Sequence, residues 1–199
     1  MALSRERIAD ELLKLLGCTD PASAIGYMLA RDILKPVLPE IDRDGLARLE
    51  ALVETEHAAA LSGDGVRRLA ALVPQDPVRA EEIAARLKLS NTIRKRLALA
   101  VTPRDDSSRE RAYRIGLEGA VDQLLLAGKA ADAAAVGTWT PPRLPISGGA
   151  LVKRGLGAGP TVAKGLKMVE DRWVAEDFPD DARVEALADQ VAAALLRDQ

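Results

Sequence analysis

Residues 64–101, DGVRRLAALVPQDPVRAEEIAARLKLSNTIRKRLALAV, contain three helix signals in succession. Asp64, Asp76-Pro77 and Ser90-Asn91 can each cap a helix, and each precedes apolar residues spaced three and four apart. No part of the stretch alternates with the period of a strand, so it predicts three short helices. Their predicted buried stripes are Val66, Leu69 and Val73, then Ala80, Ile83 and Leu87, then Ile93, Leu97 and Val101.

Similar signals extend along the rest of the chain. Ser4 opens a helix that ends at Gly17, and Asp20-Pro21 opens another that ends before the prolines of Lys35–Pro39. We expect an all-α fold, an elongated array of about ten helices without a sheet. Two subdomains, 1–136 and 146–199, are predicted on either side of a connector at 137–145, which contains three prolines and no helical period.

The composition favours a folded helical protein. Of 199 residues, 48% are hydrophobic but only 3% are aromatic, and the apolar residues are mostly those that line helix contacts. The lone cysteine, Cys18, cannot form an intramolecular disulfide, no signal peptide is apparent, and no apolar run approaches the ~20 residues that span a bilayer. We therefore expect a cytoplasmic protein that does not enter a membrane.

The net charge of −2 is unevenly distributed. Residues 86–114 contain nine basic and three acidic side chains, and residues 143–172 contain six and two. Residues 40–64 and 173–199 each contain two basic and seven acidic side chains. The two basic segments fit a nucleic-acid partner, although solvated helix faces alone can give such blocks.

The strongest basic feature is the run Arg94, Lys95 and Arg96. Consecutive helical positions lie about 100° apart, so at least two of the three side chains should face solvent. The run predicts a basic ridge that could meet RNA phosphates.

Catalytic chemistry has little support. His57, the only histidine, has no second ligand near it and is expected at the surface. The pairs Asp105-Asp106 and Asp180-Asp181 lie at helix starts, where capping explains them. No phosphate-binding P-loop and no nucleophile elbow occur. We predict no catalytic residue and no metal ligand.

Residues Gly155–Lys167 could bind an anion. The glycines allow close approach of the backbone, Pro160 favours a helix start, and Lys164 and Lys167 follow in the first turns. A tight corner between helices, in which Gly155 and Gly159 only supply unusual dihedral angles, explains the same residues. The residues alone leave both interpretations open.

The stretch Leu144–Leu166, LPISGGALVKRGLGAGPTVAKGL, resembles the C-terminal signature of CCA-adding tRNA nucleotidyltransferases and bacterial poly(A) polymerases. Ser4-Arg-Glu-Arg-Ile8 with Glu11 resembles the neck-helix motif of the same family. Body segments of these enzymes are similar to Leu87–Asn91 with Arg94 and Arg96, to Tyr113–Gly116 with Asp122, and to the run around Trp173. The similarity thus covers the last part of the neck, the body and the tail.

The resemblance implies that this chain holds the acceptor and T arms of tRNA by shape and phosphate contacts. The RNA-binding residues it implies are Arg94, Lys95, Arg96, Lys153, Arg154, Gly159, Thr161, Lys164 and Lys167, and its neck motif contains Arg5, Glu6, Arg7 and Glu11. In the family, a polymerase-β-like head contains a Gly-Ser and an Asp-x-Asp pair. The carboxylates of this pair hold Mg²⁺, and the head uses CTP and ATP. That combination does not occur here, so no cofactor and no activity are expected of the chain by itself.

Two departures from the family pattern concern the tail. Ala150 replaces a usual Asp, and Ala163 replaces a common second glycine, which together imply a variant corner. The sequence does not separate a CCA-adding parent from a poly(A) polymerase, and it leaves the oligomeric state open. An all-helical protein-interaction adaptor is the alternative of another class.

Overall fold

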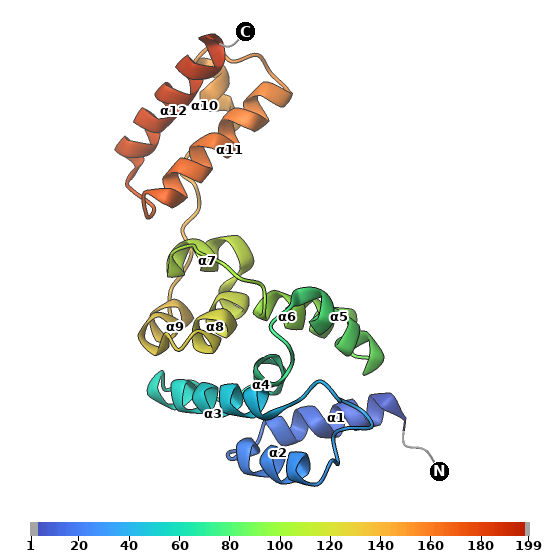
Figure 1. Ribbon diagram of the computed structural model, residues 1–199. Coiled ribbons are helices and arrows are strands. Elements are labelled where there is room, and N and C mark those ends of the chain that lie inside the picture. The colour runs from blue at the N-terminus through green and yellow to red at the C-terminus, as the bar shows by residue number, and fades with distance from the viewer. Residues whose placement is uncertain (1–3, 198–199) are drawn as a thin grey trace. The chain divides into compact units, whose positions relative to one another are not determined.

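The computed structural model describes residues 4–197, which form twelve α-helices and no strand (Figure 1). The prediction of an all-α fold is confirmed. The chain divides into two compact units between Trp139 and Thr140, with α1–α9 in the first unit and α10–α12 in the second. The helices are α1 (Arg5–Leu16), α2 (Pro21–Ala30), α3 (Arg43–Ala58), α4 (Gly65–Leu72), α5 (Pro77–Arg86), α6 (Asn91–Ala100), α7 (Ser108–Ile115), α8 (Leu117–Leu126), α9 (Ala130–Gly137), α10 (Gly148–Lys153), α11 (Pro160–Ala175) and α12 (Asp181–Arg197).

Helix starts follow the predicted capping residues. The Ser4 hydroxyl accepts a hydrogen bond from the Arg7 amide, and Asp64 accepts from two amides of the first turn of α4. Asp20, Asp76 and Ser90 cap α2, α5 and α6 in the same way. Each cap satisfies amides that have no partner inside the helix, which is why short polar side chains specify these starts.

Helix α4 is the centre of the first unit, where it contacts α1, α3, α6 and α8 (Figure 1). The sequence predicted a single buried stripe, but every side chain from Leu69 to Val73 is fully buried, so that expectation was too narrow. Close approach of neighbouring helices encloses α4. A Cβ atom at Gly65 would lie 2.4 Å from the Leu13 carbonyl oxygen, and one at Gly45 would lie 2.5 Å from the Leu72 carbonyl oxygen. Glycine is therefore required at both contacts.

In the second unit α11 and α12 pack as an antiparallel pair, and α10 packs against α11 (Figure 1). Val169 and Trp173 are buried, whereas Val162 and Leu166 are only half-buried. Gly165 occupies the middle of the packing face instead. A Cβ atom there would lie 3.2 Å from the side-chain tips of three leucines, on α10, α12 and the turn before α11. The glycine allows these helices to come close together.

Candidate nucleic-acid interface

The predicted basic ridge on α6 is only partly present. Lys95 is exposed, but the Arg96 side chain is only 15% exposed and Arg94 forms an ion pair with Glu81 at 3.2 Å. The Arg96 guanidinium lies 2.7 Å from Asp122, 3.0 Å from Asp64 and 3.1 Å from Glu118. Lys95 and Arg94, whose side chain is 31% exposed, face solvent as expected, whereas carboxylates from α8 and the start of α4 turn Arg96 inward.

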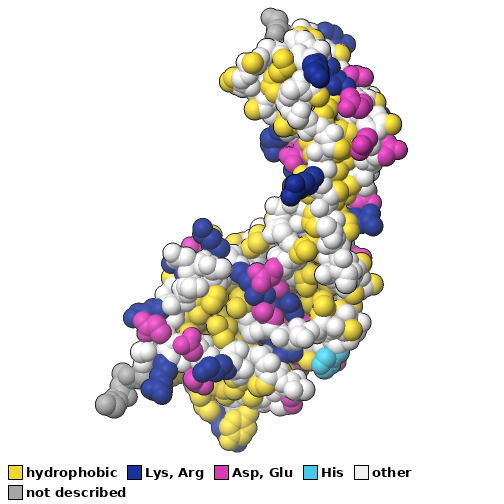
Figure 2. Space-filling model, turned by 180° about the vertical axis from the view of Figure 1, so that it is seen from behind, with side chains coloured by type: hydrophobic (Ala, Val, Ile, Leu, Met, Phe, Trp, Pro, Cys, Tyr) yellow, Lys and Arg dark blue, Asp and Glu magenta, His cyan; other side chains and the backbone are white. Residues whose placement is uncertain are grey.

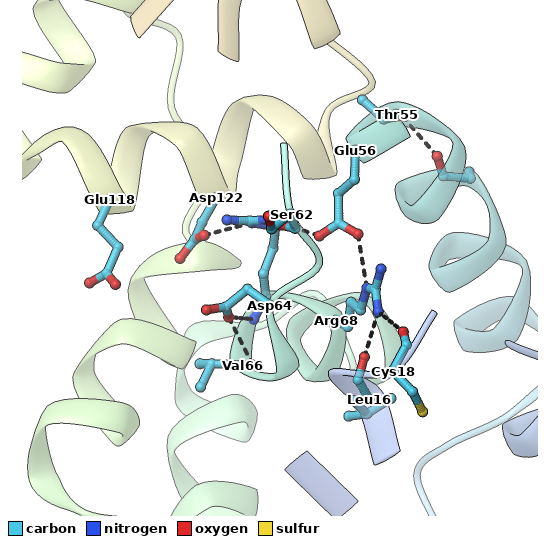
Figure 3. Close-up of polar contacts among 12 residues, drawn as sticks. Leu16, Cys18, Thr55, Glu56, Ser62, Asp64, Val66, Arg68, Glu118 and Asp122 are labelled. Carbon is cyan, nitrogen blue, oxygen red and sulfur yellow. Dashed lines mark hydrogen bonds and ion pairs between the residues drawn. The ribbon is translucent and has the colours of Figure 1, made fainter. Parts of the chain in front are cut away.

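Arg96 belongs to a buried ionic network in the first unit, of which Figure 3 shows Glu56, Arg68 and Asp122. Glu56 on α3 is fully buried and accepts hydrogen bonds from Arg67 at 2.7 Å and from Arg68 at 2.8 Å. Asp122, also fully buried, accepts from Arg67 at 2.8 Å and from Arg96 at 2.7 Å. Each buried charge therefore has an opposite charge within hydrogen-bonding distance, which buried ions require.

The network also fixes the end of α1. One Arg68 nitrogen donates hydrogen bonds to the carbonyl oxygens of Leu16, at 2.7 Å, and Cys18, at 2.6 Å (Figure 3). These groups lie at or just beyond the last turn of α1, where carbonyls lack partners inside the helix. The network thus ties α1 to α4, and through Glu56 to α3.

The surroundings keep Arg96 and Asp64 charged. Burial opposes the charge on Arg96, but its hydrogen bond to Asp122 and the neighbouring carboxylates raise its pKa above the ordinary value. Burial alone would raise the pKa of Asp64, yet the Arg67 amide and the Arg96 charge lower it below the ordinary value. The depressed pKa of Asp64 stabilises the fold above the ordinary carboxyl range, and this contribution is lost as pH falls through the lowered pKa.

The network was not identified from the sequence. Asp122 was noted only within a family-like segment, and Glu56 was not singled out. The available signal was the pair Arg67-Arg68 inside an apolar helix. When such a helix packs on all sides, two adjacent charged side chains cannot both reach solvent.

The corner between α10 and α11 places several of the predicted RNA-binding residues together. Gly155 and Gly159 have φ angles of 95° and 110°, a region that glycine adopts without strain. Gly159 precedes α11, and no side chain caps its first amides. No atom lies within 4 Å of a Cβ built at Gly157 or Gly159, so the backbone of the turn is open. Thr161 is half-buried in the first turn of α11.

The cations of this corner differ in their environment. Lys153, Lys164 and Lys167 are exposed, and Lys167 lies 3.8 Å from Asp171. Arg154 instead pairs with Glu185 and Asp189 of α12, which raise its pKa. Its guanidinium ties α10 to α12, so Arg154 has a structural role that the sequence did not predict.

The neck-motif residues lie along α1. Glu6 pairs with Lys88 at 2.8 Å, and this hydrogen bond is the main cause of the lowered pKa of Glu6. Glu11 pairs with Lys14 at 2.9 Å. Arg7 is exposed at the edge of an apolar groove of about 370 Å³ between α1 and residues 28–38, whereas one Arg5 nitrogen is buried without a hydrogen-bond partner. The motif therefore contributes to the surface of residues 4–44.

Other candidate groups have ordinary structural explanations. His57 is exposed, as predicted. Asp42 and Asp44 have Asp-x-Asp spacing, but Asp42 caps α3 through the Gly45 amide and the pair lies on no strand. Within residues 4–197 no group of three potential ligands is placed to hold a metal ion, and no helix is long and apolar enough to cross a membrane.

The surface carries mixed charge. On the face seen in Figure 2, Lys and Arg side chains alternate with Asp and Glu over both units. Many of the cations pair with carboxylates of the described residues, whereas others, among them Lys95, Lys129 and Lys164, are exposed and take part in no ion pair.

One family model matches this chain. It is described as "Probable RNA and SrmB- binding site of polymerase A" and matches residues 1–44. The match covers α1, α2 and the first residues of α3, including the neck-motif residues. A comparison with curated proteins finds no match. Over its first 44 residues the chain is thus similar to the RNA-binding region of polymerase A, a similarity that fits both CCA-adding enzymes and poly(A) polymerases.

Proposed function

We propose that this chain binds tRNA as the neck, body and tail region of a CCA-adding tRNA nucleotidyltransferase. In this proposal it holds the acceptor and T arms in the cytoplasm while a polymerase-β-like head adds CMP and AMP. The observation that carries the proposal is the match of residues 1–44 to an RNA-binding region of polymerase A. The family-like segment Leu144–Leu166, at the opposite end of the chain, supports it independently.

Exposed lysines are the groups best suited to hold RNA. Of the lysines in the two basic segments, 86–114 and 143–172, Lys95, Lys153 and Lys164 are exposed and take part in no ion pair within residues 4–197. Each can approach a phosphate without first breaking an ion pair. Neutralising phosphates in this way releases counterions, which favours binding. Arg96 and Arg154 would have to break several ion pairs to do the same, so we assign them to positioning the helices.

A poly(A) polymerase parent is the second candidate, favoured by the description of the matching family model. The two differ in product. The complete protein should add a short CCA end to tRNA under the first proposal and an adenylate tract under the second.

The isolated chain should transfer no nucleotide. In the proposed parent enzyme, carboxylates of the head hold Mg²⁺ ions that activate the attacking hydroxyl and stabilise the leaving group. We therefore expect no incorporation of labelled CMP or AMP into a tRNA that lacks its CCA end. Incorporation that a chelator abolishes would contradict this assignment.

Reversing the charge of Lys164 and Lys167 should weaken tRNA binding by the purified chain. Each lost phosphate contact lowers the dependence of log affinity on log salt concentration by about 1, so Lys164→Glu with Lys167→Glu should flatten the slope by about 2. Both side chains are exposed, so the melting temperature should change little.

A matched control reverses two exposed cations of the first unit, with Arg79→Glu and Lys129→Glu. It changes the net charge equally but leaves the corner intact. If both double variants bind tRNA alike across the salt series, the corner is only a structural turn.

A further inference from the structure

Tyr27 differs from the other aromatic side chains of the protein. It is 56% exposed, whereas the other four are buried or half-buried. Trp173 and Phe178 pack against each other, and Trp139 lies on the hydrophobic core of the first unit. An exposed ring adds little to the core, so the Tyr27 ring on α2 is available to a partner.

The guanidinium of Arg31 stacks on the Tyr27 ring. Its central carbon lies 3.5 Å from the ring centroid, within the range of a cation–π contact. Arg31 is exposed and forms no ion pair with any carboxylate among residues 4–197. The pair therefore presents a flat surface together with a positive charge that has no partner within the described residues.

The chemistry of this surface fits an unpaired nucleotide. Nucleobases stack on tyrosine rings and on the planar faces of arginine, and the charge can meet the adjoining phosphate. A paired base within a helix offers no free face, so the partner that fits is single-stranded RNA. Lys35, exposed four residues after Arg31, is a second cation close by in the chain, although it lies 3.8 Å from Asp32.

We propose that Tyr27 and Arg31 form a stacking platform for a base of single-stranded RNA. The inference rests on the proposed RNA-binding function and adds a site that reads the base face, separate from the lysines that meet phosphates. The platform lies within residues 1–44, the segment similar to an RNA-binding region.

The test measures binding of the full chain to a short, fluorescently labelled oligoadenylate by anisotropy over a salt series. Tyr27→Leu removes the ring and should weaken binding roughly 5- to 100-fold. The salt slope should stay unchanged, because no charge is removed. Tyr27→Phe keeps the ring and should bind like the unmodified protein.

Two arginine variants separate charge from stacking. Arg31→Lys keeps the charge but loses the plane, so it should weaken binding without changing the salt slope. Arg31→Ala should also make the slope shallower, by about 0.7 for one lost contact to a single strand.

Controls distinguish stacking from damage to the fold. Val78→Ala removes a side chain that is 68% exposed on α5, outside residues 1–44, and should leave oligoadenylate binding unchanged. Inorganic polyphosphate, which has no bases, should bind Tyr27→Leu and the unmodified protein equally. The platform is overturned if Tyr27→Leu binds oligoadenylate normally, or if it loses polyphosphate binding to the same extent.

Failure of this inference is separable from failure of the proposed function. Normal oligoadenylate binding by Tyr27→Leu, with tRNA binding that still depends on Lys164 and Lys167, overturns the platform alone. A chain that binds neither RNA overturns both.

Discussion

Glu56→Ala should lower the free energy of unfolding of the first unit by about 3–5 kcal/mol. The substitution removes the carboxylate that faces both Arg67 and Arg68, whose side chains are only 9% and 3% exposed. Arg67 keeps Asp122 and Arg68 keeps two carbonyl oxygens, but one buried positive charge then has no counter-charge. The cost arises from that uncompensated charge more than from the lost hydrogen bonds.

Urea denaturation followed by circular dichroism measures the effect. Glu54→Ala is the matched control, because Glu54 lies two residues earlier on the same helix and is exposed, so its loss should change stability by less than about 0.5 kcal/mol. Glu56→Gln keeps the shape and tests the charge alone. Equal stability of the Glu54 and Glu56 variants would mean that the network does not hold the helices together.

Trp173→Ala should destabilise the second unit by about 3–5 kcal/mol. The indole is 2% exposed, packs edge-on against Phe178 at 5.0 Å between ring centroids, and donates a hydrogen bond to the Pro179 carbonyl oxygen at 2.9 Å. It thus fills the core and also holds the turn in which Asp177 and Phe178 have positive φ angles. Truncation leaves a large cavity in a unit of only three helices.

Thermal unfolding measures this effect. Trp173→Phe keeps most of the bulk and loses the N–H donor, so it should cost about 1 kcal/mol, the typical net value of one hydrogen bond. Arg172→Ala, at an exposed neighbouring position, should change the melting temperature little. If Trp173→Ala unfolds at the same temperature as Arg172→Ala, the indole does not organise the unit.

Local signals made the helices predictable. A cap such as Asp64 acts on amides two and three residues away, so the sequence contains the whole interaction.

Interactions between distant residues were not predictable in this way. The partners Arg67 and Asp122 are 55 positions apart, and Arg96 and Asp122 are 26 apart. When the distant carboxylates are unknown, a run of three cations predicts a solvated ridge. Helical periodicity alone gives no reason to place Arg96 inside. The enclosure of α4 on all sides has the same origin, since it depends on which helices surround it.

The hydrogen bonds from Arg68 to the end of α1 set a lower limit on the size of a fragment that keeps the structure around α1. Residues 1–44, although similar to an RNA-binding region, stop within the first turn of α3. A peptide cut at that point would lack Arg68, and it would lack α4, against which α1 packs. The segment 1–44 that matches the family model is therefore not an independent structural unit. The smallest fragment that preserves this surface has to include at least α3 and α4.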